Sequence, residues 1–169
     1  MVTEKILAQY SRLETVRLTL RPFLLSDAEA LLENGRDPRA NQWSLRFADL
    51  SAAEANIRRY WLGQPAGKWV IEQDGVFLGA VECHLHQDIE AVEIGYLLLP
   101  KYWGQGVATE AARAVMQLAF GPLEAQSVLI GCDESNQQSA SVARRLGLHL
   151  AWLVFSAHQD AETWWVRYR

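Results

Sequence analysis

Hydrophobic and polar residues alternate along the chain with two different periods, and each period predicts one kind of element. Between residues 15 and 22, Val16, Leu18 and Leu20 alternate with polar neighbours, which is typical of a half-buried strand. Two later apolar segments flank Asp74-Gly75, a pair that favours the positive φ angles of a tight hairpin. The sequence therefore predicts further strands at residues 69–73, 77–86, 91–99, 127–132, 148–156 and 163–168.

Capping boxes predict two early helices, because a Ser side chain and a Glu three residues later can share the free N–H groups of a helix start. Ser26 with Glu29 and Ser51 with Glu54 fit this pattern. The two helices are expected to end near Gly35 and Gly63.

Two later helices are expected at residues 106–120 and 135–145, before Gly121 and Gly147. In the longer one, apolar residues recur on one face, whereas Thr109 and Glu110 are expected on the other. Strands and helices therefore alternate in a mixed α/β order.

The composition fits one compact domain over residues 1–169, since half of the chain is hydrophobic and no Gly/Ser-rich linker divides it. No apolar run approaches the roughly 18 residues of a membrane span, and no secretory signal is visible, so a soluble cytoplasmic protein with no membrane partner is expected. A net charge of −4 argues against nucleic acid as a partner. Cys83 and Cys132 are expected to be reduced core residues. The oligomeric state stays open, and a homodimer is compatible with the sequence.

The segment with the clearest chemistry is residues 93–110, EIGYLLLPKYWGQGVATE, in which a strand, a loop and a glycine-opened helix follow one another. Free N–H groups at a helix start suit a pyrophosphate. Two familiar glycine loops are excluded. A Walker loop needs Lys and Ser/Thr where this chain has Val107 and Ala108, and a Rossmann fingerprint needs Gly or Ala in place of Thr109.

Residues 103–108, WGQGVA, resemble the acetyl-CoA motif of the GNAT superfamily of N-acetyltransferases. That motif most often begins with Gln or Arg, but an aromatic residue such as Trp103 is frequent in the branch that contains the ribosomal-protein-alanine acetyltransferases. Asn136-Gln137-Gln138-Ser139 matches the Asn-x-x-Ser pattern of the same branch. The resemblance extends over residues 15–147, although the glycine loop alone would also be compatible with a plain turn.

The resemblance implies the GNAT fold, an α/β (α+β) arrangement with a mixed, mostly antiparallel sheet of about seven strands and about four helices. Its fourth and fifth strands splay apart, and the pantetheine arm of acetyl-CoA lies between them. A backbone N–H in residues 96–98 would polarise the thioester carbonyl. The implied cofactor-binding residues are Tyr96, Leu97, Leu98, Trp103, Gly104, Gln105, Gly106, Val107, Ala108, Thr109, Asn136 and Ser139.

Acetyl transfer to an amine needs a base and an acid. Glu93, on the strand that borders the thioester, is predicted to be the base, and Glu82 is the alternative. A purely structural role for Glu93, paired with a neighbouring backbone group or an arginine, also remains open. Many family members use a tyrosine as the acid, but this chain has Ala143 at that position. Ser139 is therefore the candidate acid, although Asn136 and Ser139 are also good helix caps.

Trp43 and Trp61 fall in the early helical region that roofs the acceptor cleft in this fold, so they are predicted to bind the acceptor, with core packing as the alternative. His84 and His86 would share one face of a strand, as zinc ligands sometimes do. No third ligand is apparent, and no metal is expected.

The predicted function is acetyl-CoA-dependent transfer of an acetyl group to a primary amine by direct attack in a ternary complex. A small-molecule amine or a protein N-terminus is the expected acceptor. Two alternatives remain open: a GNAT-fold module that binds acyl-CoA as a sensor or partner without turnover, and a nucleotide-binding protein of unrelated fold.

Overall fold

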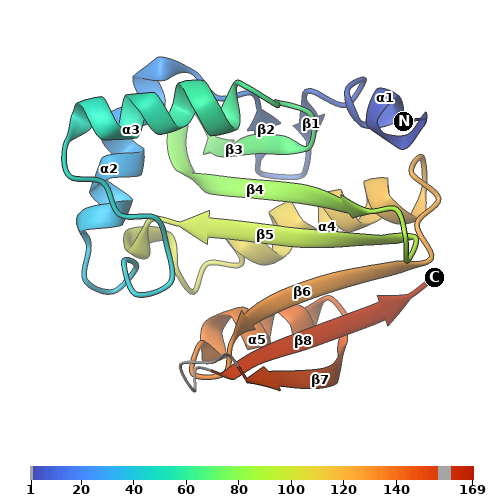
Figure 1. The fold of residues 1–169 in the computed structure, drawn as a ribbon. Coiled ribbons are helices and arrows are strands. Elements are labelled where there is room, and N and C mark those ends of the chain that lie inside the picture. Colours follow the sequence, from blue (N-terminus) through green and yellow to red (C-terminus); the bar gives the residue numbers. More distant parts are fainter. Residues whose placement is uncertain (1, 156–160) are drawn as a thin grey trace.

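A single open sheet of eight strands runs through the computed structural model, which describes residues 2–155 and 161–169 (Figure 1). The strand order is β1-β2-β3-β4-β5-β6-β8-β7, and only the β5–β6 pair is parallel. The strands are β1 (Leu13–Glu14), β2 (Thr19–Arg21), β3 (Lys68–Gln73), β4 (Val76–His86), β5 (Ala91–Leu98), β6 (Ser127–Asp133), β7 (His149–Phe155) and β8 (Ala161–Tyr168).

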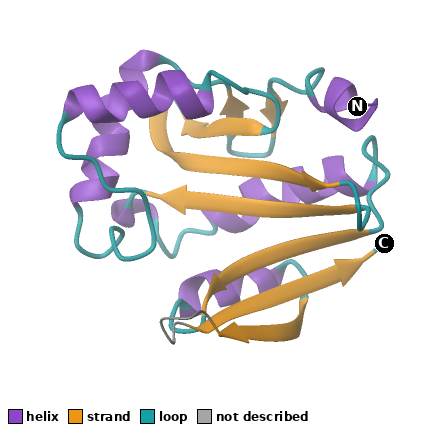
Figure 2. Cartoon of the chain, viewed as in Figure 1, coloured by secondary structure: helices purple, strands orange, loops and turns teal. Residues whose placement is uncertain are grey.

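Helices cover both faces of the sheet (Figure 2). The α-helices are α1 (Val2–Leu7), α2 (Ala28–Arg36), α3 (Leu50–Asn56), α4 (Val107–Phe120) and α5 (Gln137–Arg145). A π-helical turn, η2 (Ile57–Trp61), continues α3, and short 3-10 turns lie at η1 (Leu25–Asp27) and η3 (Pro100–Tyr102). Within the described residues, no helix is long and apolar enough to cross a membrane. The predicted mixed, mostly antiparallel fold is confirmed, with one strand and one helix more than expected.

The first predicted strand, residues 15–22, is correct only for Thr19–Arg21 (β2), because residues 15–18 form a bend between two short strands. Val16 lies in this bend and is 98% exposed. The hydroxyl of Thr15 accepts a hydrogen bond from the N–H of Leu18 at 2.9 Å and donates one to Glu110 on α4 at 2.7 Å. This side-chain contact with a distant helix turns the chain and overrides the alternating pattern.

The two predicted capping boxes are also wrong in detail, since aspartates provide the contacts. The carboxylate of Asp49 accepts a hydrogen bond from the N–H of Ala52 at 2.9 Å, so α3 starts before Ser51. At the earlier helix, Asp27 accepts from the N–H of Leu24 at 2.7 Å. Asp and Ser are comparable caps, and at α3 the N-cap is Asp49 instead of Ser51.

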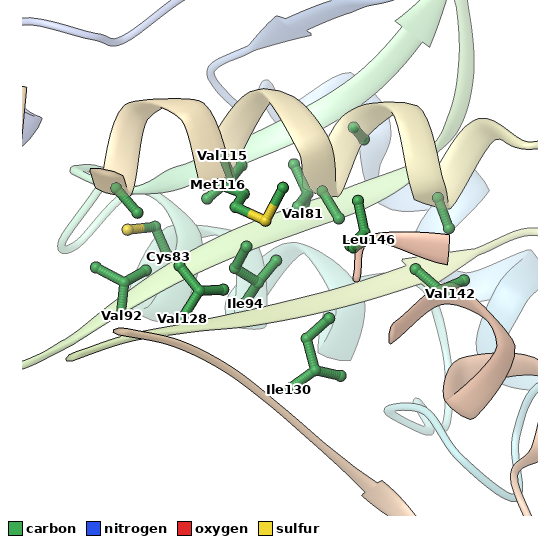
Figure 3. Close-up of a cluster of buried hydrophobic side chains, with 14 of the residues drawn as sticks. Val81, Cys83, Val92, Ile94, Val115, Met116, Val128, Ile130, Val142 and Leu146 are labelled. Atoms are coloured by element: carbon green, nitrogen blue, oxygen red, sulfur yellow. The ribbon is translucent and has the colours of Figure 1, made fainter. Parts of the chain in front are cut away.

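One hydrophobic core lies between α4 and the sheet, and it anchors the helix that begins at the glycine loop. Val115 and Met116 of α4 face Ile94 of β5 and Val128 of β6 (Figure 3). A second core lies on the opposite face, where α2 and α3 pack on the sheet. Both cysteines are buried and free, and burial raises the pKa of Cys83 to about 12. The Cys83 thiol is therefore not activated as a nucleophile.

The two central parallel strands separate after a short contact. β5 and β6 pair over only three residues, from Ala91 with Ser127 to Glu93 with Leu129. Beyond Glu93 the two strands diverge (Figure 1), although β5 remains paired with β4 and β6 with β8. The predicted splay is therefore present, and it leaves two inner strand edges facing a gap.

Candidate active site

A cavity of about 700 Å³ lies where β5 and β6 diverge. Its walls come from the end of β5, the loop before α4, the first turn of α4, the end of β6 and the start of α5. Residues of α2 and of the connection to α3 also line it. A cavity of this volume has the size of a cofactor-binding or substrate-binding site.

The loop before α4 has the backbone that the glycine pattern predicts. Gly104 and Gly106 have φ angles of 73° and 76°, in the left-handed region that side chains disfavour. Gly106 is the N-cap of α4, and its carbonyl oxygen accepts from the N–H of Glu110 at 3.0 Å. The loop therefore exposes the positive end of α4 at the cavity wall.

Thr109 lies in the first turn of α4 with a buried hydroxyl for which no described residue offers a hydrogen-bond partner. It is 9% exposed and lines the cavity, whereas its sequence position predicted the outer face of the helix. An orphaned hydroxyl beside free helix N–H groups fits an anionic group such as a phosphate. The residues present therefore suit the pyrophosphate of acetyl-CoA.

Arg17 and Glu110 tie the β1–β2 bend to this loop. Arg17 Nε donates to Glu110 at 2.7 Å, and Arg17 Nη1 donates to the carbonyl oxygen of Gln105 at 3.1 Å. Burial raises the pKa of Glu110, but hydrogen bonds from Thr15 and Arg17 outweigh it and leave that pKa lowered. Glu110 thus holds the loop in place as a charged group.

Tyr96 and Ser139 meet across the gap between β5 and α5. Their hydroxyl oxygens are 2.7 Å apart. Burial raises the pKa of Tyr96, so this phenol keeps its proton at neutral pH. Both residues were predicted to line the site, but the direct contact between their side chains was not.

Asn136 caps α5, because its Oδ1 accepts from the backbone N–H of Ser139 at 3.1 Å. The capping interpretation is confirmed for Asn136, while its predicted contact with the cofactor stays a prediction. The hydroxyl of Ser139 faces Tyr96, whereas its backbone N–H is held by the cap. Ser139 itself is therefore not the cap of this helix.

The end of β5 is fixed by two side chains. The carbonyl oxygen of Leu98 accepts from Nε1 of Trp103 at 3.0 Å and from Nδ2 of Asn34 at 2.8 Å. Tyr96, Leu97 and Leu98 all line the cavity, as the resemblance implied for the oxyanion-binding segment.

The two glutamates considered as bases lie on the face of the sheet opposite α4. Glu93 contacts Nε2 of His86 at 2.8 Å, and Glu82 contacts Nε2 of His84 at 2.9 Å. The hydrogen bond to Glu82 raises the pKa of His84. Tyr60 donates to Glu82 at 2.5 Å, and burial raises the pKa of that tyrosine, with Glu82 adding to the shift.

Neither Glu93 nor Glu82 is among the residues that line the cavity. The carboxylates that do line it are Asp133 at the end of β6 and Glu162 on β8, which are partners in the strand register. Sequence reasoning missed both, because they carry no motif, and only the β6–β8 pairing brings them together.

The two predicted acceptor-binding tryptophans have different positions. Trp43 lines the cavity and is 36% exposed. Trp61 is 1% exposed, stacks on Phe23 with ring centroids 4.1 Å apart, and donates to Asn56. The prediction for Trp61 is wrong, since it is a core residue of the α2–α3 layer.

His84 and His86 are each engaged by a glutamate rather than by each other. Across residues 2–155 and 161–169, no group of three His, Cys, Asp or Glu side chains is arranged to hold a metal ion.

Comparison with known proteins identifies the family. Residues 17–149 match the model of the acetyltransferase (GNAT) domain, so the chain belongs to the GNAT acetyltransferase family. It is 34% identical over 52% of its length to the uncharacterized protein YkkB of Bacillus subtilis strain 168, and 26% identical over 61% to the spermidine N(1)-acetyltransferase of Escherichia coli K12. The matches span 53% and 66% of these two relatives.

Solved structures agree with the fold. A GNAT-family acetyltransferase from Bacillus anthracis superimposes with a TM-score of 0.82, 20% identity and coverage of 93% of this chain and 98% of that one. RimL, a ribosomal L7/L12 α-N-protein acetyltransferase in complex with coenzyme A, gives a TM-score of 0.75 and 21% identity, covering 91% and 95%. The predicted family and fold are confirmed.

Proposed function

We propose that this chain transfers an acetyl group from acetyl-CoA to a primary amine within one domain, by direct attack in a ternary complex. The observation that carries the proposal is the cavity between β5 and β6, in which free helix N–H groups and the orphaned hydroxyl of Thr109 face the same space. The spermidine acetyltransferase and the CoA complex of RimL support it as relatives of the same fold.

The loop and first turn of α4 would hold the pyrophosphate, with Thr109 donating to a phosphate oxygen. The inner edge of β5 would pair with the pantetheine arm, and Asn136 and Ser139 would lie beside it. Bound in this way, acetyl-CoA supplies an activated thioester carbonyl. A backbone N–H in residues 96–98 would stabilise the negative charge that develops on the carbonyl oxygen.

The acceptor arrives as an ammonium ion and has to lose a proton before its nitrogen can attack. We assign this task to Glu93, acting directly or through a water, with Glu82 as the alternative. The new N–C bond forms as the C–S bond breaks. The nitrogen then gives up its second proton to solvent, and the sulfur gains a proton from a donor group that solvent reprotonates.

Ser139 would supply the proton to the departing thiolate. A serine hydroxyl is a weak acid by itself, but Tyr96 at 2.7 Å can donate to its oxygen and leave the serine O–H free for the sulfur. Trp43 would pack against the acceptor.

An amine panel tests the function. It includes spermidine, free amino acids and short peptides with free N-termini, and it is read out by thiol release with mass spectrometry of the acetylated product. We expect at least one primary amine to be acetylated in proportion to the CoA released. If the protein bound CoA tightly but released no thiol from acetyl-CoA with any amine, the proposed enzymatic function would be refuted.

That outcome would favour the second candidate function, a module that binds acyl-CoA without turnover. The absence of Glu93 and Glu82 from the cavity lining is the specific observation in its favour.

A further inference from the structure

Asn34 is a buried side chain with an incomplete set of hydrogen bonds. It lies in the last turns of α2, is 1% exposed and lines the cavity. Its Nδ2 donates to the carbonyl oxygen of Leu98, and only the NH₂ group of an amide can do so, which fixes the orientation of the side chain. The other atom, Oδ1, is buried, and no described residue donates to it.

A buried amide oxygen without a donor destabilises the folded protein. Such a group calls for an explanation, and a ligand N–H inside the cavity would provide it. Two ligands could supply an N–H: the acceptor amine and the amides of the pantetheine arm.

The position of Asn34 favours the acceptor. Other residues of the cavity lining belong to the connection between α2 and α3, including Gln42, Trp43 and Ser44. The proposed phosphate-binding residues come instead from the loop before α4 and the first turn of α4, whereas the Leu98 carbonyl that Asn34 binds belongs to the end of β5. Asn34 thus belongs to a different wall from the phosphate-binding turn.

We propose that Oδ1 of Asn34 accepts a hydrogen bond from the amino group of the acceptor. This inference rests on the proposed function and adds a selectivity to it. After attack on the thioester, the nitrogen of a primary amine carries two N–H groups, so one can stay bound to Asn34 while the other is lost as the amide forms. The nitrogen of a secondary amine carries a single N–H at that stage and cannot do both. The site therefore selects primary over secondary amines.

Asn34→Leu is the informative variant, since it keeps the branched shape and number of heavy atoms of the side chain and removes the unpartnered oxygen. The Leu98 carbonyl retains its bond from Trp103 at 3.0 Å. We expect the KM for the amine to rise about tenfold, the preference for primary amines to disappear, and the KM for acetyl-CoA to stay unchanged. The thermal unfolding temperature should not fall, because the buried orphan is gone.

Asn56→Leu is the matched control. Oδ1 of Asn56 accepts from Nε1 of Trp61 at 3.0 Å, outside the cavity lining. This variant should lower the unfolding temperature and leave the KM for the amine unchanged. The probes are alaninamide, benzylamine and propylamine, each compared with its N-methyl derivative.

If Asn34→Leu raised the KM for acetyl-CoA and not the KM for the amine, the hydrogen-bond donor to Asn34 would be an amide of pantetheine. That result would overturn the proposal. Unchanged KM values with a lower unfolding temperature would overturn it too, as would a parent protein that binds none of the six amines. Calorimetric titration of the amines into the CoA complex needs no turnover. Loss of amine affinity in Asn34→Leu without thiol release would therefore uphold the subsite while refuting the enzyme.

Discussion

Two walls of the same cavity are built in different ways. The first, here called the loop wall, consists of Trp103, Gly104 and residues 106–109 and 136–139, and it depends on backbone: two left-handed glycines and the starts of α4 and α5. The second, the α2 wall, consists of Asn34, Ala40 and residues 42–44 and depends on individual side chains. Backbone donors suit a ligand part that is always the same, whereas side chains can be exchanged to suit one acceptor. The comparison assigns constant chemistry to the loop wall and selectivity to the α2 wall.

The largest expected effect concerns the base, which belongs to neither wall. Glu93→Gln keeps the shape and should reduce turnover at pH 7 by about 10²–10⁴-fold, with partial recovery at high pH where free amine is abundant. Turnover over a pH series with the best amine of the panel measures this. Glu82→Gln and Glu162→Gln are the comparison variants. If Glu93→Gln kept parental turnover while Glu162→Gln lost it, the base would lie on β8 within the cavity lining.

A substitution that changes the backbone of the loop wall should abolish CoA binding. Gly106→Val forces a β-branched residue to a φ angle of 76°, and we expect CoA affinity measured by calorimetry to fall roughly 100-fold or more. Gly75→Val is the control, because Gly75 has a φ angle of 78° in the distant β3–β4 hairpin. Both variants should lose stability, but only the first should lose CoA. Equal CoA affinity of the two folded variants would remove the loop from the site.

A smaller loss of turnover is expected when Ser139 or Tyr96, the residues proposed to lie near the reacting sulfur, is changed. Ser139→Ala should lower turnover about tenfold with little change in the KM for acetyl-CoA, since the proton is needed mainly in the transition state. Tyr96→Phe should lower turnover by a similar factor. The double variant should lower turnover no more than either single variant, because the two hydroxyls form one relay. Full additivity would contradict the relay.

The smallest effect tests the support behind the loop wall. The pKa of Glu110 is lowered, so its charged form stabilises the fold above the ordinary pKa of 4.5, and this contribution is lost as the pH falls below that value. Glu110→Gln should lose about 1 kcal/mol of unfolding free energy at pH 7, and the difference should shrink near pH 3. Glu33→Gln, at an exposed ion pair with Lys101, should change it by less than about 0.5 kcal/mol. Denaturant titrations at both pH values provide the measurement.

Features set by local backbone chemistry could be predicted from the sequence. The Asp74-Gly75 turn has φ angles of 51° and 78°, as a tight hairpin requires, and α4 begins directly after Gly106. The last residue of the predicted strand 148–156 and the polar turn after it fall outside the described residues.

Features set by contacts between distant segments could not be predicted. Thr15 turns the chain because Glu110 lies opposite, and Trp61 is buried because Phe23 stacks on it. Asn34 and Glu162 carry no motif, and they reach the cavity only through the packing of α2 and the pairing of β8. The loop wall was therefore visible in the sequence, while most of the α2 wall was not.

The three-residue contact between β5 and β6 also has a mechanical consequence. The β6–β8–β7 segment pairs with the rest of the sheet only at one end, and a ligand arm between the diverging edges would act as an inserted strand. A ligand that binds only the folded protein adds its binding free energy to the free energy of unfolding. Binding in the gap would therefore stabilise the sheet. Amide hydrogen exchange at the inner edges of β5 and β6 would slow together as the gap is filled. In this sense the proposed cofactor is also a removable part of the fold.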